Sequence, residues 1–116
     1  MKITRMEGRF IMNAREYQEY VRQGASEKYQ DLKFAALALV GEVGEVCDVI
    51  KKANIYTEQN IDVREKIKDE VGDVAWQFFA LLNSAKLTFE EVVDFNVEKL
   101  NKRHGGATID LTGGKR

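Results

Sequence analysis

The sequence predicts an all-α fold, and three observations support this prediction. The 116 residues contain no proline, so no long segment carries the residue that most strongly breaks helices. Apolar residues recur at intervals of three and four over long stretches, which is the pattern of amphipathic helices. Two of these stretches open with a capping box, the side-chain arrangement that starts helices. A chain of this length is expected to form one domain over residues 1–116.

The first two expected helices lie in the N-terminal half. Asn13, with Glu16 three residues later, is expected to cap a short helix that ends at Gly24. Ser26 or a neighbouring residue is expected to open a long second helix that continues to about Ala53. The apolar stripe of this second helix comprises Leu32, Ala36, Leu39, Val43, Val46 and Ile50.

Two more helices are expected in the C-terminal half. After a mostly polar linker, helical periodicity extends over about residues 61–85. Thr88 and Glu91 then form a second capping box, and the helix that they open is expected to end before Gly105. Residues 107–116 are expected to be a tail, either flexible or a short strand. The sequence therefore predicts four helices.

Composition excludes several classes of protein. The 18 basic and 19 acidic side chains give a net charge of -1, which argues against general binding of nucleic-acid polymers. Cys47 is the single cysteine, so neither an intramolecular disulfide nor a Cys-rich zinc site is expected. The chain has no apolar run near the roughly 20 residues that span a bilayer and no signal-peptide pattern at its start. We expect a cytoplasmic protein that does not enter the membrane.

A carboxylate pattern occurs twice. The segments LVGEVGEV and IKDEVGDV share the order apolar, two residues, Glu, Val, Gly, acid, Val. Helical spacing puts Glu42 and Glu45 on one side of the second helix, and Glu70 and Asp73 on one side of the third. Glu42 and Glu70 border the apolar stripes, where an unpaired charge costs several kcal/mol. Something must compensate these charges.

If the second and third helices are antiparallel neighbours, the four carboxylates converge. Such a group cannot be fully ionised without a cation, and oxygen-only ligands favour Mg²⁺ or Mn²⁺. Gly41, Gly44 and Gly72 inside the motifs indicate close helix approach or room for a ligand. The alternative is that the acids are ordinary exposed residues of amphipathic helices. A di-iron site is not favoured, because it needs E-x-x-H and the only histidine, His104, lies far from both motifs.

These motifs resemble those of the MazG-type all-α nucleoside triphosphate pyrophosphohydrolases, whose pattern is E-x-x-E, a spacer, and E-x-x-D. The string GEVGEVCDVIKK, the 24 residues between Glu45 and Glu70, and DEVGDV match that pattern. The likeness extends from REYQ to NVEKLNKRHGG, that is, over residues 15–106. It implies a four-helix MazG-type bundle completed by oligomerisation, as a dimer or a tetramer. It also implies Mg²⁺-dependent cleavage of a (deoxy)nucleoside triphosphate between its α- and β-phosphates, for nucleotide-pool control or house-cleaning. By position, Glu42, Glu45, Glu70 and Asp73 would be catalytic metal ligands, one of which also activates water.

Further residues are candidates for binding the substrate. Asn96, Lys99 and Arg103 share one side of the fourth helix and resemble the family's N-x-x-K-[LM]-x-x-R, so they are expected to hold phosphates. A solvated basic helix end is the alternative. Trp76 and Gln77 follow Asp73 and are candidates for stacking on a nucleobase and reading its edge, although such a tryptophan is more often a subunit contact. Tyr17 and Gln18 of the first helix are similar candidates.

The rival hypothesis is a non-catalytic helical module. In that case the acidic groove binds metal structurally or pairs with a partner's basic helix, and the chain serves oligomerisation or regulation. A family member that has lost its activity would also fit this hypothesis. The intact set of Glu42, Glu45, Glu70 and Asp73 argues against such a loss, because loss of activity leaves no reason to keep acids at a packing margin.

Overall fold

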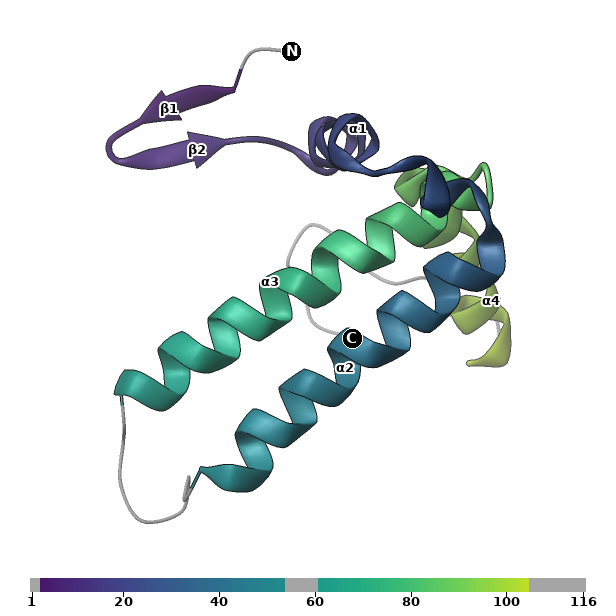
Figure 1. Ribbon diagram of the computed structural model, residues 1–116. Helices are drawn as coiled ribbons and strands as arrows, with labels where there is room; N and C mark the ends of the chain where they lie inside the picture. Colours follow the sequence, from purple (N-terminus) through teal and green to yellow (C-terminus); the bar gives the residue numbers. More distant parts are fainter. Residues whose placement is uncertain (1–2, 54–60, 105–116) are drawn as a thin grey trace.

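The computed structural model describes residues 3–53 and 61–104. Four α-helices dominate it, so the predicted all-α class is confirmed for the body of the chain (Figure 1). The predicted tail over residues 107–116 lies outside the described residues. In chain order the elements are β1 (Thr4–Met6), β2 (Arg9–Ile11), α1 (Ala14–Gly24), the 3₁₀ segment η1 (Glu27–Gln30), α2 (Leu32–Lys52), α3 (Ile61–Ser84) and α4 (Phe89–Arg103).

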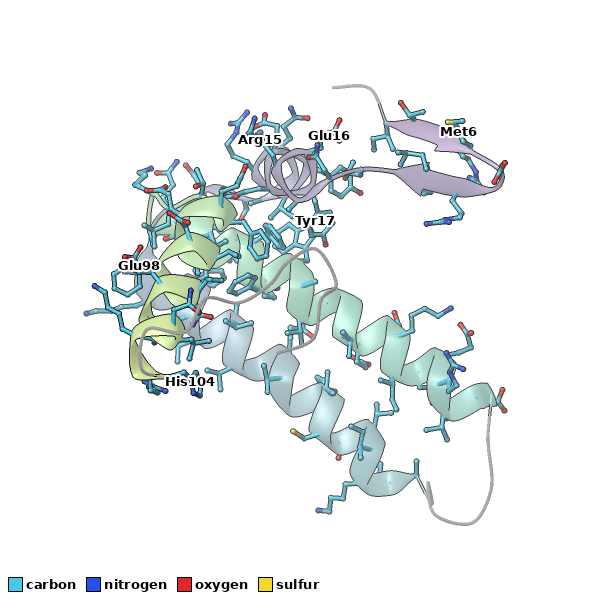
Figure 2. The ribbon with its side chains drawn as sticks, turned by 180° about the vertical axis from the view of Figure 1, so that it is seen from behind. Met6, Arg15, Glu16, Tyr17, Glu98 and His104 are labelled. Atoms are coloured by element: carbon cyan, nitrogen blue, oxygen red, sulfur yellow. The ribbon has the colours of Figure 1, made fainter. Side chains whose placement is uncertain are left out.

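Helices α2 and α3 form the backbone of the fold. They lie side by side and antiparallel over most of their length, as both views show (Figures 1 and 2). α1 crosses the C-terminal half of α3, and α4 lies at the end of the pair where α2 begins and α3 ends (Figure 1). The short linker between two long helices leads to this antiparallel arrangement. The pair carries both carboxylate motifs.

The predicted starts of α1 and α4 are confirmed, together with their capping boxes. The Asn13 side chain accepts from the Glu16 backbone N–H while the Glu16 side chain accepts from the Asn13 backbone N–H. Thr88 and Glu91 repeat this exchange at the start of α4. These contacts satisfy backbone donors that a helix start leaves unpaired, which is why the pattern marks helix starts so reliably.

The predicted start of the second helix at Ser26 or nearby is wrong by several residues. Ser26 precedes only the 3₁₀ segment η1, and α2 begins at Leu32. Asp31 is the N-cap, because its side chain accepts from the backbone N–H of Lys33 at 2.9 Å. The intervening turn positions Tyr29 against α3, where it matters for the site described below.

A β-hairpin at the N-terminus was not predicted. β1 and β2 pair antiparallel, with Arg5 opposite Phe10 and Met6 opposite Arg9. The two-residue turn has left-handed backbone at both Glu7 (φ 52°) and Gly8 (φ 74°), which matches the twist of a hairpin. Glutamate is uncommon in that conformation, so the sequence carried only a weak turn signal.

The junction of α1, α3 and α4 is held by Gln18. Its side-chain amide donates to the Asn83 Oδ1 (2.9 Å) and to the Leu87 carbonyl (2.8 Å), and its Oε1 accepts from the Phe89 backbone N–H at 3.1 Å. Asn83 in turn donates to the Gln18 carbonyl. Gln18 is therefore committed to the turn between α3 and α4, which leaves its side chain no free donor for a nucleobase.

The single chain buries few side chains completely. Among the described residues, the buried apolar set consists of Val21, Ala35, Ala80 and Leu82. Large apolar side chains stay open to solvent, with Leu37 at 73%, Val40 at 67% and Phe95 at 74% exposure. Leu37 and Val40 are three apart on α2 and so share one side of that helix. Within residues 3–53 and 61–104, each helix is too short or too polar to span a bilayer.

Candidate functional site

The two carboxylate motifs meet in the middle of the α2–α3 pair. Carboxylate oxygens of Glu42, Glu70 and Asp73 all lie within 4.8 Å of one another. Glu42 and Glu70 are half-buried, whereas Asp73 is exposed. Glu45 is exposed and lies outside this close group. We refer to Glu42, Glu70 and Asp73 as the acidic cluster.

Helix geometry explains why the cluster forms. Residues three apart on an α-helix face the same side, so each E-x-x-[ED] motif presents two acids together. The antiparallel packing of α2 on α3 then turns the two motifs toward each other. Half-burial of Glu42 and Glu70 agrees with their predicted position at the margin of the apolar stripe.

The surroundings of Glu70 disfavour its ionised form. Burial raises the pKa of the Glu70 carboxyl, and the negative charges of Asp69, Asp73, Glu45 and Glu42 raise the same pKa further. The charge of Glu45 thus helps to raise the pKa of Glu70, although Glu45 lies outside the acidic cluster. In the described part of the chain, none of the four motif acids forms an ion pair. The nearby lysines Lys52 and Lys68 pair instead with Asp48 and Glu65.

The donor set fits a hard divalent cation. Mg²⁺ and Mn²⁺ prefer carboxylate and water oxygens, and three carboxylates on converging helices supply such ligands. A cation there would also remove the mutual repulsion that raises the pKa of Glu70. Side chains added at Gly41, Gly44 or Gly72 would meet no described atom within 4 Å. The glycines therefore do not mark close helix packing within one chain, and they leave open space around the motifs.

Tyr17 of α1 is an aromatic residue that packs on the helix carrying Glu70 and Asp73. Its ring packs edge-on against Phe79 of α3, with centroids 5.1 Å apart, and lies on the side of α1 that faces α3 (Figure 2). The pKa of Tyr17 is raised chiefly by burial, and the charges of Tyr20 and Asp73 add to the shift. Tyr17 therefore packs on α3 within the electrostatic influence of Asp73. Neither this neighbourhood nor the contribution of Asp69 followed from the motif spacing.

Trp76 and Gln77 both contact Tyr29 of η1. The Tyr29 hydroxyl donates to the Gln77 Oε1 at 2.8 Å, and the Tyr29 and Trp76 rings meet edge to face with centroids 5.3 Å apart. Both residues are half-buried and lie one turn beyond Asp73. Their side chains are thus fixed next to the cluster by a contact that the sequence did not reveal.

The three predicted phosphate-binding residues are exposed on α4. Phe89, at the start of α4, packs against Phe79 with centroids 5.3 Å apart, and the Arg15–Glu90 ion pair (2.9 Å) ties α4 to α1. From there α4 runs along the end of the α2–α3 pair, and His104 caps its C-terminus (Figure 2). These three residues are Asn96, Lys99 and Arg103. In the described part of the chain, neither Lys99 nor Arg103 forms an ion pair with an acid of the cluster.

Comparison with known proteins adds two findings. A family model described as the MazG nucleotide pyrophosphohydrolase domain matches residues 30–107, a range that includes both acidic motifs and α4. The chain is also similar to the Gene 37 protein of Mycobacterium phage L5, with 28% identity over 102 residues. That alignment covers 84% of this chain and 87% of the phage protein. The name of the phage protein states no activity.

The raised pKa of Glu70 gives a signed stability prediction. Because the folded, metal-free protein binds the Glu70 proton more tightly than the unfolded chain does, stability is present below the ordinary value of 4.5 and is lost as pH rises through the raised value. In EDTA at about pH 7, Glu70→Gln should therefore melt at a higher temperature than the wild type, and this difference should shrink near pH 4. Thermal melts by circular dichroism measure it.

Glu98→Gln is the control, because Glu98 is an exposed acid on α4 away from the cluster. It should leave the melting temperature unchanged at both pH values. A Glu70→Gln protein that melts below the wild type in EDTA would show that the carboxylate stabilises the fold.

Proposed function

The chain belongs to the MazG nucleotide pyrophosphohydrolase domain family, and we propose that it hydrolyses a (deoxy)nucleoside triphosphate with the help of Mg²⁺. Cleavage between the α- and β-phosphates would give the nucleoside monophosphate and pyrophosphate. The observation that carries the proposal is the acidic cluster, which gathers both family motifs at one place. Mn²⁺ should substitute for Mg²⁺, because both take oxygen ligands.

In this proposal the motif acids bind the metal ion, and one of them accepts a proton from the attacking water. Glu42, Glu70 and Asp73 are close enough to share an ion, and Glu45 stands one helical turn from Glu42. A bound divalent ion would neutralise charge on the phosphate oxygens and lower the pKa of the attacking water. The water oxygen bonds to the α-phosphorus while the bond from that phosphorus to the bridging oxygen breaks. One of the four carboxylates accepts the proton that water loses.

The remaining substrate contacts come from the other helices. Lys99 and Arg103 are exposed cations and, with Asn96, suit the phosphates that the metal does not neutralise. Trp76 is half-buried, one turn beyond Asp73, and suits stacking on the base. The Oε1 of Gln77 accepts from Tyr29, and its amide N–H groups suit hydrogen bonds to the edge of the base. Since α4 lies at the end of the α2–α3 pair within one chain, we propose that its phosphate contacts are made in the assembled oligomer.

The assembly is a homo-oligomer in this proposal. The open side of α2 with Leu37 and Val40 supports it, as does the space around Gly41 and Gly44. Such an apolar surface on a small chain favours burial against a second copy. The non-catalytic alternative also permits an oligomer, so assembly alone does not distinguish the two functions.

Pyrophosphate release tests the activity. With Mg²⁺ and a panel of canonical and modified (deoxy)nucleoside triphosphates, the wild type should release pyrophosphate from at least one, and EDTA should stop the release. Glu42→Gln should abolish turnover, because it removes a charged ligand while keeping the size of the side chain. Glu98→Gln should keep full activity. Release by Glu42→Gln at the wild-type rate, or no release from any nucleotide by the wild type, would contradict the proposal.

The same assay examines the basic side of α4. Arg103→Ala should lower kcat/KM by about one to two decades, the effect of losing a charge-assisted bond of about 1.5–3 kcal/mol. Binding of Mn²⁺ should stay unchanged, because Arg103 is no metal ligand. Arg22→Ala is a matched control, since Arg22 is exposed at the end of α1 and pairs with Glu19. Unaltered kinetics in Arg103→Ala would leave the basic residues of α4 as a solvated helix end.

Sedimentation equilibrium tests the assembly. At micromolar concentration the wild type should be a dimer or larger, and Val40→Glu should shift it toward the monomer because it puts a charge into the apolar contact. Lys28→Glu, an exposed change in η1 rather than on the apolar side of α2, should leave the mass unchanged. A monomeric wild type would refute the oligomer.

A further inference from the structure

The ring of Tyr29 in η1 is held in place on two sides. It packs edge to face on Trp76 of α3, with centroids 5.3 Å apart, and on Phe34 of α2, with centroids 5.0 Å apart. The Trp76 ring is supported in turn by the end of α1, since a Cβ at Gly24 would lie 3.9 Å from its Cζ2 atom. Aromatic rings packed at such distances have little freedom to move. The Tyr29 hydroxyl therefore has a defined position beside α3.

The contact between Tyr29 and Gln77 sets the orientation of the Gln77 amide. The Tyr29 hydroxyl donates to the Gln77 Oε1 at 2.8 Å. If the amide were turned over, the hydroxyl would accept from the Gln77 Nε2, and its own hydrogen would find no other acceptor in the described part of the chain. An unpaired donor on a half-buried side chain is unfavourable, so the orientation with Oε1 on Tyr29 is preferred. The two Nε2 hydrogens then point away from Tyr29.

Gln77 shares one side of α3 with two acids of the cluster. It stands four residues after Asp73 and seven after Glu70, and residues at these intervals lie on the same side of an α-helix. Four residues advance a helix by about 6 Å along its axis, and seven residues by about 10 Å. These distances are comparable with the separation of base and phosphates in a nucleotide. A nucleotide whose phosphates bind a metal ion at the cluster therefore has its base within reach of the Gln77 amide.

An amide that presents only N–H donors selects bases by the group opposite it. A carbonyl oxygen of the base accepts from the Nε2, whereas an exocyclic amino group is itself a donor and would be left unpaired. Uracil and hypoxanthine carry a carbonyl group where cytosine and adenine carry an amino group. A site that hydrogen-bonds one of these groups discriminates against the base that lacks it, because the partner in the protein is then unpaired.

We propose that Tyr29 is a positioning residue that fixes Gln77 to read a carbonyl group of the base, so that the chain prefers a nucleotide with a keto base over its amino counterpart. The inference rests on the proposed function for the phosphate part of the ligand. Gln77 touches the base, and Tyr29 acts only through Gln77. The orientation of one amide thus determines the class of base.

Matched pairs of nucleotides test the preference. dUTP has a carbonyl group where dCTP has an amino group, and dITP differs from dATP in the same way. In steady-state pyrophosphate release with Mg²⁺, the wild type should favour the keto member of its better pair about tenfold or more in kcat/KM. Calorimetric titration with the α,β-imido analogues, which are not cleaved between these phosphates, measures the same preference without turnover.

Three variants test the role of Tyr29. Tyr29→Phe keeps the packed ring and removes the hydroxyl, so the amide turns over freely and the keto preference should fall to about twofold or less. Gln77→Glu should reverse the preference, because a carboxylate accepts from an amino group. Tyr20→Phe is the matched control, since it removes the hydroxyl of an exposed tyrosine of α1 and should keep the wild-type ratio.

The outcomes separate the base contact from the hydrolysis. A wild type that favours the amino bases, or an unchanged ratio in Tyr29→Phe, would overturn the positioning role. An equal loss for both members of a pair in Tyr29→Phe would also overturn it, because damaged packing alone has that effect. Pyrophosphate release without any keto preference would refute the base contact and leave the proposed function standing. Analogue binding with the expected ratios, but no release from any nucleotide, would support the base contact and refute the hydrolase.

Discussion

The mutual repulsion of carboxylates between two packed helices is the constraint on which this structure depends. Glu42, Glu70 and Asp73 lie within 4.8 Å of one another, and Glu45 and Asp69 add their charge to the same field. Packing that forces like charges together at a half-buried margin is unfavourable unless a cation or a partner compensates it. The long antiparallel pair of α2 and α3 nevertheless holds the acids in place. The repulsion therefore lowers the stability of the metal-free fold, and a bound divalent ion would remove this loss.

The elements around the α2–α3 pair fix side chains that lie near the acidic cluster in sequence. α1 crosses the C-terminal half of α3, and η1 holds Trp76 and Gln77 through Tyr29, so these two side chains one turn beyond Asp73 are fixed by packing. The other side of α2 remains apolar and open, and α4 lies at the end of the α2–α3 pair (Figure 1). In the proposed function, the cations of α4 contact the phosphates in the assembled oligomer.

Local signals in the sequence were enough for most of the fold and for the centre of the site. Asn13 with Glu16, and Thr88 with Glu91, act through contacts within one helical turn, so both helix starts were predictable. The repeated motif predicted that four carboxylates converge, and the structure brings Glu42, Glu70 and Asp73 together but leaves Glu45 outside the close group. The start of α2 at Leu32 was not, because Asp31 and Ser26 are equally good caps and tertiary packing decides between them. The hairpin was missed because Glu7 is an unusual residue for a left-handed turn position. The places of Tyr29 and Arg103 depend on contacts between distant segments, which spacing along the chain does not encode.

Binding of Mn²⁺ shows whether the acidic cluster is a divalent-cation site. Electron paramagnetic resonance of free Mn²⁺ during a titration reports binding without any nucleotide or turnover. The account predicts that the wild type binds Mn²⁺ and that Asp73→Asn weakens this binding about tenfold or more, because one charged ligand becomes neutral. Asp48→Asn, which removes an acid of α2 outside the cluster that pairs with Lys52, should bind as the wild type does. Equal Mn²⁺ affinity in the wild type and Asp73→Asn would contradict the account.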